Sequence, residues 1–202
     1  MKFARPLPAA LLTTLLVAIA LVLAGCASTS PNPRAGDELK FASVDLPRYM
    51  GKWYIIANIP FFGERDYVGS YAEWTLRPDG KIADVFVGKK GGFDAPETLR
   101  EFVDTIVPDS GNAKWSVRLF WPIYVTQLTL YVDPDYRTTI LGYPGKSLGW
   151  IFARSPEISN AAYRDLLGRL DAQGYDTSLF KRVPQTPDQV GKPGFQSPGQ
   201  KN

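Results

Sequence analysis

The groups in this chain that could perform acid–base chemistry are carboxylates spaced along its predicted strands. Two carboxylates held close together can act as a general acid and a general base. The candidates are Glu73, Asp84, Glu101 and Asp104. Nothing in their spacing selects a pair, and polar residues on a solvated strand face account for all four. The sequence therefore predicts no catalytic residue.

Other reactive side chains are scarce. Histidine is absent from the 202 residues, and cysteine occurs once, at Cys26. The lack of histidine excludes Ser-His-Asp and Cys-His catalytic arrangements, histidine-ligated zinc and a haem held by a proximal histidine. A single cysteine excludes an internal disulfide and a CxxC site. We expect neither a metal site nor a cofactor.

The charge balance bears on the partner. The net charge is +3, and Lys2 and Arg5 belong to a leader that we expect to be removed, so the rest of the chain is nearly neutral. Nucleic-acid binding needs a concentrated basic stripe, so a nucleic-acid partner is not expected.

The aromatic fraction of 13% is more than a small core usually needs. A ligand cavity would account for the excess.

The first 25 residues have the layout of a secretory signal. A basic start is followed by an apolar run, 7–23, that is short for a membrane span of about 20 residues. The run ends at Leu23-Ala24-Gly25-Cys26, which resembles the lipobox of bacterial lipoproteins. That resemblance implies a lipoprotein signal peptide over 1–25 and a lipid on Cys26. An ordinary signal peptide with a chance cysteine is the alternative.

Lipidation would anchor the protein to a membrane without a spanning segment. Two or more acyl chains hold a protein stably in a membrane, whereas a single chain binds only marginally. Ala27 stands where an aspartate would retain a Gram-negative lipoprotein at the inner membrane, so we expect the outer membrane. Residues 26–40 are rich in Ser, Pro, Asn and Gly and predict a tether. Residues 184–202 are rich in Pro, Gly and Gln and predict a disordered tail.

Between the tether and the tail, short strand-like runs alternate with turn residues about every ten positions. In 70–76, for example, Ala72 and Trp74 share one face while Glu73 and Thr75 share the other. The eight runs are 53–59, 70–76, 82–87, 99–107, 114–120, 127–132, 138–143 and 148–153. Eight strands predict an all-β fold, an antiparallel up-and-down barrel with room for side chains or one small ligand. The barrel domain is expected over 41–183.

One helix is predicted after the last strand, over Asn160–Gln173. Ser159 can cap its start, and Gly174 can adopt the left-handed conformation that ends it. Its apolar residues recur on a single stripe, so one face should pack against the barrel.

Three motifs resemble those of the lipocalins, in the branch that holds the bacterial outer-membrane lipocalins and apolipoprotein D. Gly51-Lys52-Trp53, followed by Tyr-x-Ile-Ala, resembles the G-x-W signature of the first strand. Asp133-Pro134-Asp135 partly matches a turn between the sixth and seventh strands, although a plain hairpin turn explains it equally well. Arg154 matches an arginine that closes the last strand and lies over the first-strand tryptophan in the family. The resemblance thus implies that Gly51, Trp53 and Arg154 close the barrel and that the helix packs outside it. A core tryptophan after a turn in another β protein is the alternative.

A ligand would contact the inward faces of the strands. Counting alternate residues gives Ile55, Ala57, Ala72, Trp74, Trp115, Val117, Leu119 and Trp150 as the predicted cavity lining. The parity of 127–132 is ambiguous. These residues could equally fill the barrel as core, and the resemblance favours a cavity. The resemblance implies that Phe61 and Phe62 lie in the long first loop, by the barrel mouth.

The resemblance implies a binding protein: an outer-membrane lipoprotein that takes a fatty acid or lysophospholipid into its barrel for lipid storage, transport or membrane maintenance. A lipocalin-fold enzyme acting on a small apolar substrate is the alternative, and an ionisable residue on an inward face would favour it. The predicted lining contains no Asp, Glu or Lys. An envelope protein that binds another protein through its surface is a third reading. A homodimer is left open.

Overall fold

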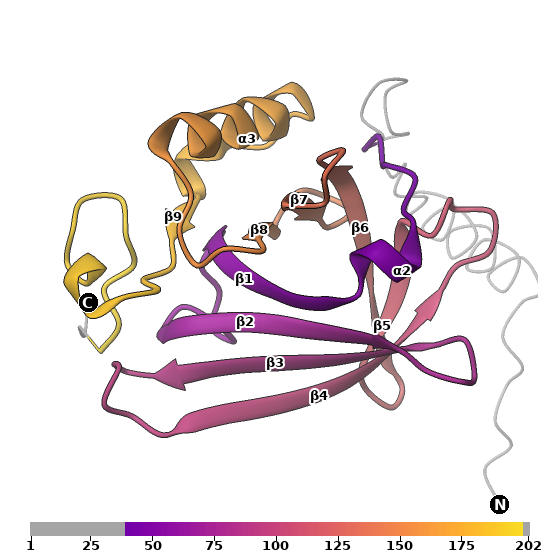
Figure 1. Cartoon of the computed structure of the whole chain (residues 1–202), viewed down its shortest axis with the longest axis horizontal. Coiled ribbons are helices and arrows are strands. Elements are labelled where there is room, and N and C mark those ends of the chain that lie inside the picture. Colours follow the sequence, from indigo (N-terminus) through magenta and orange to yellow (C-terminus); the bar gives the residue numbers. More distant parts are fainter. Residues whose placement is uncertain (1–38, 200–202) are drawn as a thin grey trace, which may run out of the picture. The chain divides into compact units, whose positions relative to one another are not determined.

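The computed structural model describes residues 39–199 (Figure 1). The predicted signal peptide, Cys26 and the tether up to residue 38 lie outside the described residues. No helix within 39–199 has the length and hydropathy needed to cross a membrane.

Eight antiparallel strands form a closed barrel, which confirms the predicted fold class. In chain order they are β1 (Gly51–Asn58), β2 (Tyr67–Leu76), β3 (Ile82–Lys90), β4 (Glu97–Ile106), β5 (Lys114–Phe120), β6 (Ile123–Val132), β7 (Thr138–Gly142) and β8 (Gly149–Ala153). Each strand from β2 to β7 pairs with the next one in the chain, and β1 pairs with both β8 and β2. A ninth strand of two residues, β9 (Lys181–Arg182), pairs antiparallel with the end of β1, at Ala57 and Asn58.

The helix forms where the sequence predicts it and packs outside the barrel. Helix α3 spans Asn160–Ala172, and the Ser159 side chain accepts a hydrogen bond from the backbone N–H of Ala162. Leu166 and Leu170 of its apolar stripe are buried in a cluster with residues of β1, β6, β7 and β8. Figure 1 shows the helix outside the strands. Burying this stripe stabilises a helix of a length that would be marginal alone.

A short helix that the sequence analysis missed, α2 (Leu46–Tyr49), leads into β1. Proline is tolerated in the first turn of a helix, where its missing N–H would have no partner, so Pro47 is compatible with it. The helix turns Tyr49 into the barrel, where the Tyr49 ring stacks on Trp74 at a centroid distance of 5.1 Å. Its hydroxyl lies 2.9 Å from that of Thr139. Two short 3₁₀ helices, η1 (Thr177–Leu179) and η2 (Pro187–Gln189), follow α3.

One end of the barrel is closed by aromatic rings and an arginine. Trp53 is fully buried, and its Nε1 donates to the Tyr49 carbonyl at 2.7 Å. The Arg154 guanidinium lies 3.8 Å from the centroid of the Trp53 ring. Its Nη atoms donate to the carbonyls of Arg48, Met50 and Lys52 at 2.7 to 2.8 Å. Arginine alone among the side chains offers five donors in a planar fork that can also stack on an indole.

Gly51 permits this closure. Its φ of +94° is one that side chains with a Cβ rarely adopt, and a Cβ there would lie 3.4 Å from Arg154 Nη1. Gly51, Trp53 and Arg154 therefore lie together, as the resemblance implies.

The predicted disordered tail is wrong for residues 184–199, which are ordered against the barrel. Strands β1 and β2 pair only from Gly51 to Tyr54 and then diverge. Where they diverge, Gln185 Nε2 donates to the carbonyls of Ile55 at 2.8 Å and Ser70 at 3.0 Å. The polar composition of this segment suggested disorder. Composition alone cannot reveal that a polar side chain such as Gln185 hydrogen-bonds to strand carbonyls that lack a neighbouring strand.

Removing this amide should loosen the barrel. Gln185→Ala leaves two strand carbonyls without their partner, so we expect the free energy of unfolding to fall by roughly 1–3 kcal/mol. Urea denaturation followed by tryptophan fluorescence measures it. Ser197→Ala, at an exposed position of the same segment, is the matched control and should change stability little. Equal stability of the two variants would contradict the role of Gln185.

Candidate functional site: the barrel interior

Most of the predicted lining residues do face the interior of the barrel. Ile55, Ala72, Trp74 and Trp115 are buried in one hydrophobic cluster, and Trp150 packs against it. Val117 is also buried and lies opposite the inward-facing Asp104.

Trp74 and Trp115 lie at the closed end. Their ring centroids are 5.4 Å apart, and both rings contact Tyr49. They form the floor of the interior. Trp150 lies towards the other, open end, where its ring meets that of Phe61 edge to face at 6.2 Å.

Two predicted lining residues lie elsewhere. Ala57 faces outward, in the cluster beneath α3, because a bulge between Ile55 and Ala57 shifts the alternation of β1 by one residue. Leu119 is 44% exposed and lies next to the β5–β6 hairpin at the open end, so it is not enclosed. A similar bulge in β6, between Thr129 and Tyr131, explains why the parity of 127–132 was ambiguous.

The interior also contains carboxylates, which the sequence analysis wrongly assigned to solvated faces. Asp84 pairs with the inward Trp74 across β2 and β3, and Asp104 pairs with the buried Ile82 across β3 and β4. Residues directly opposite each other in a sheet share a face, so both aspartates point inward. Asp104 is completely buried. Ile82 and Phe86 flank Asp84 at alternate positions, and this alternation was the missed signal.

Burial changes the protonation of this pair. Burial raises the pKa of Asp84 to about 7, and the indole N–H of Trp74 partly opposes that rise. Burial, followed by the negative charge of Asp84, raises the pKa of Asp104 to about 8. Because two neighbouring carboxylates resist being charged together, the pair retains a proton near neutral pH.

A second polar group lies towards the open end. Glu64, in the loop after β1, accepts hydrogen bonds through Oε2 from Trp150 Nε1 and Asn58 Nδ2, both at 2.9 Å. Burial raises the pKa of Glu64, and these hydrogen bonds oppose the rise. The Arg100 guanidinium lies 4.3 Å from the centroid of the Phe86 ring and donates to the Gly63 carbonyl at 2.9 Å. The first loop is thus held to the interior by polar side chains.

The comparisons with known proteins agree with this geometry. The model of the lipocalin-like domain family matches residues 44–185. This chain is a lipocalin. The outer membrane lipoprotein Blc of Escherichia coli K12 is 30% identical over 169 residues, which are 82% of this chain and 92% of Blc. Temperature-induced lipocalin-1 of Arabidopsis thaliana is 30% identical over 154 residues, 71% of this chain and 80% of that one.

Solved structures show the same fold at lower identity. Insecticyanin from the tobacco hornworm Manduca sexta has a TM-score of 0.58 at 18% identity, covering 79% of this lipocalin and 88% of insecticyanin. Lobster apocrustacyanin A1 has a TM-score of 0.56 at 15% identity, covering 70% and 80%.

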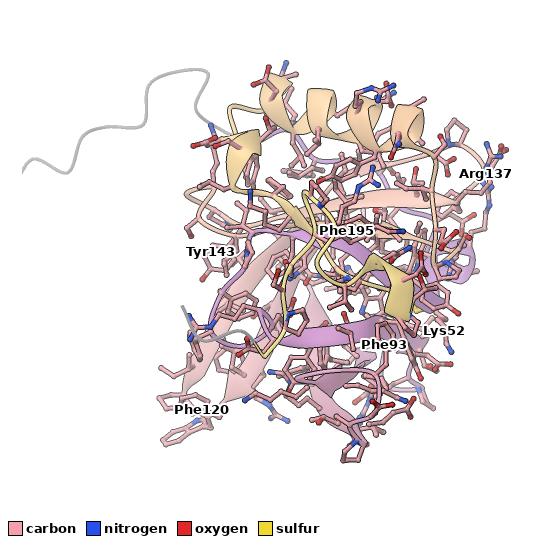
Figure 2. All side chains as sticks on the ribbon, turned by 90° about the vertical axis from the view of Figure 1, so that its left-hand side faces the viewer. Lys52, Phe93, Phe120, Arg137, Tyr143 and Phe195 are labelled. Carbon is pink, nitrogen blue, oxygen red and sulfur yellow. The ribbon has the colours of Figure 1, made fainter. Side chains whose placement is uncertain are left out.

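Around the open end the lipocalin exposes several aromatic side chains. Phe62 is 88% exposed in the first loop, and Phe120 and Trp121 are 66% and 80% exposed at the β5–β6 hairpin. Figure 2 shows Phe120 at the outer edge of the molecule.

A separate hollow of about 810 Å³ lies outside the barrel, between the first loop and the C-terminal segment. Its lining includes the exposed cations Arg65, Lys90 and Lys181 together with Phe195, which Figure 2 shows on the C-terminal segment. It is open to solvent and charged, unlike the interior, so it does not suit an acyl chain.

The buried carboxylates predict a pH-dependent stability. The pKa of each is raised above the unfolded value of about 4, so the folded state binds more protons than the unfolded chain between these values. The free energy of unfolding should therefore fall as the pH rises from about 5 to about 9. Urea denaturation at several pH values measures the slope.

Asp104→Asn removes one titrating group and should flatten the slope, leaving the variant more stable than the wild type at the alkaline end. The control is Glu101→Gln, an exposed position on the same strand. A wild-type stability that rises with pH over this range would contradict the assignment.

Proposed function

We propose that this lipocalin binds a fatty acid or a lysophospholipid inside its barrel. The observation that carries the proposal is an interior with an aromatic floor, apolar walls and a guanidinium towards the open end. An acyl chain gains affinity through buried apolar area, at about 25 cal/mol per Å², and needs few polar contacts. Apolar walls provide that area.

Arg100 supports an anionic head group. Its Nε is buried and has no hydrogen-bond partner among the described residues, and it forms no salt bridge within 39–199. Guanidinium groups bind carboxylates and phosphates through paired hydrogen bonds. A ligand with its head on Arg100 would direct its chain from the open half of the barrel towards the floor of Trp74 and Trp115.

Titration with palmitic acid and, separately, with a single-chain phosphatidylcholine tests the binding. Trp74, Trp115 and Trp150 contact the interior, so bound ligand should change tryptophan emission saturably. Val117→Phe narrows the interior and should weaken binding at least tenfold. Thr75→Phe, at an exposed position, is the matched control and should bind as the wild type does. The absence of saturable binding to either lipid would overturn the proposal.

Catalysis is a second candidate function, because the inward carboxylates are the feature that favours it. A carboxylate pair that shares a proton can supply both an acid and a base. Mass spectrometry of a bound epoxy fatty acid, before and after incubation, would detect its hydrolysis. Turnover that disappears in Asp104→Asn would establish an enzyme, whereas recovery of unchanged ligand supports binding alone.

We propose further that the protein is a lipid-anchored lipoprotein of the bacterial outer membrane. The lipobox-like sequence ending at Cys26 and the similarity to outer membrane lipoprotein Blc support this.

The anchor can be tested directly. Cys26→Ala should abolish incorporation of labelled palmitate, because the chain has no other cysteine, and should release the protein from the membrane fraction. Ser28→Ala is the control and should leave labelling unchanged. Label that persists in the Cys26 variant would contradict the anchor.

A further inference from the structure

Two kinds of buried polar atom inside the barrel have no hydrogen-bond partner among residues 39–199. Asp104 is completely buried, and neither of its carboxylate oxygens accepts a hydrogen bond among residues 39–199. Trp74 is 1% exposed, and its Nε1–H, which lies near Asp84 and lowers the pKa of that carboxyl, makes no hydrogen bond of normal geometry within the described part of the chain. Buried polar groups in folded proteins nearly always have a partner, so each of these atoms indicates a missing one.

These atoms lie on adjoining strands and face the same space. Trp74 on β2 is directly opposite Asp84 on β3, and Asp84 is a diagonal neighbour of Asp104 on β4. Diagonal side chains on one face of a sheet are close enough for a single group to bridge them. The indole N–H is a buried donor and not a further carboxylate, so this is more than a cluster of acidic residues.

The chemistry of these atoms restricts what could bind them. An unpaired N–H needs an acceptor, and a carboxylate oxygen needs a donor. A hydroxyl group is both. The carboxylate of a fatty acid would be repelled by Asp84 and Asp104, an ammonium would leave the indole N–H unpaired, and a plain methylene chain would satisfy neither group.

The separation of Arg100 and Asp104 along β4 restricts where on a ligand the group that binds Asp104 would lie. Arg100 and Asp104 lie four residues apart on β4 and face the same side, roughly 13 Å along a strand. A fatty acid whose carboxylate bound Arg100 would pass Asp104 about that far along its chain.

We propose that Trp74, Asp84 and Asp104 form a subsite for a hydroxyl group carried on the acyl chain, and that the preferred ligand is a hydroxylated fatty acid. This inference rests on the proposed function, because it specifies the ligand of the same barrel. The hydroxyl accepts from Trp74 Nε1–H and donates to an oxygen of the aspartate pair.

Isothermal titration calorimetry with two acids of equal length tests it. The probes are dodecanoic acid and 12-hydroxydodecanoic acid, whose terminal hydroxyl an extended chain carries about the required distance from the carboxylate. The wild type should bind the hydroxy acid at least tenfold more tightly. Asp104→Leu should abolish that preference while retaining dodecanoic acid binding. Glu101→Leu, on the solvent face of the same strand, should keep the preference.

A second variant tests the donor of the subsite and changes the core in a different way. Trp74→Phe keeps an aromatic ring in the floor but removes the donor, and it should also reduce the preference for the hydroxy acid. Circular dichroism verifies that each variant is folded.

The outcomes separate the two proposals. Equal affinity of the wild type for both acids would overturn the hydroxyl subsite, with water as the partner of these atoms, and leave the proposed function intact. A preference that survives in both folded variants would also overturn the subsite. Binding of neither acid, together with no binding of palmitic acid or lysophospholipid, would overturn the proposed function itself.

Discussion

The pairing of β1 with β2 closes the sheet, and the interior exists only because of it. This seam is short, since only four residue pairs, from Gly51–Trp74 to Tyr54–Tyr71, join the two strands. Lys52 adds a contact across it, with its ammonium 4.0 Å from the centroid of the Tyr71 ring. At the closed end Arg154 ties the start of β1 to α2, and beyond the last pair Gln185 bridges the diverging strands. Two side chains from distant parts of the chain thus extend a seam that the backbone leaves short.

Closure also decides which polar groups are buried. In an open sheet one face can remain solvated, and a carboxylate on it keeps its water. Once the sheet closes, residues with inward register are enclosed whatever their polarity, except near the open end. Asp84 and Asp104 are enclosed in this way, and their raised pKa values follow from the loss of water and from their mutual proximity. The interior is therefore apolar on most of its surface and acidic at one place.

The interior is graded along its length. Tyr49, Trp53, Trp74 and Trp115 fill the closed end, the aspartate pair lies on strands β3 and β4, and Glu64 and Arg100 lie towards the first loop. An amphiphilic ligand entering from the open end would meet charge first, apolar walls next and aromatic rings last. Such a gradient suits a molecule with one polar head, and the aspartates, of which Asp84 lies directly opposite Trp74 of the floor, add a requirement at the far end of its chain.

Local sequence by itself determined the strands and the helix with its Ser159 cap, because these depend on alternation and turn residues. The meeting of Gly51, Trp53 and Arg154 was implied by the resemblance of short motifs to a known family. Only the tertiary structure decided where that alternation breaks. The bulge in β1 turned Ala57 outward, and the residue types around it do not predict a bulge. The burial of Asp84 and Asp104 and the ordering of Gln185 also depended on partners far away in the chain. A single sequence specifies local preference, whereas burial and hydrogen-bond partners are properties of the closed sheet, in which distant residues share one interior.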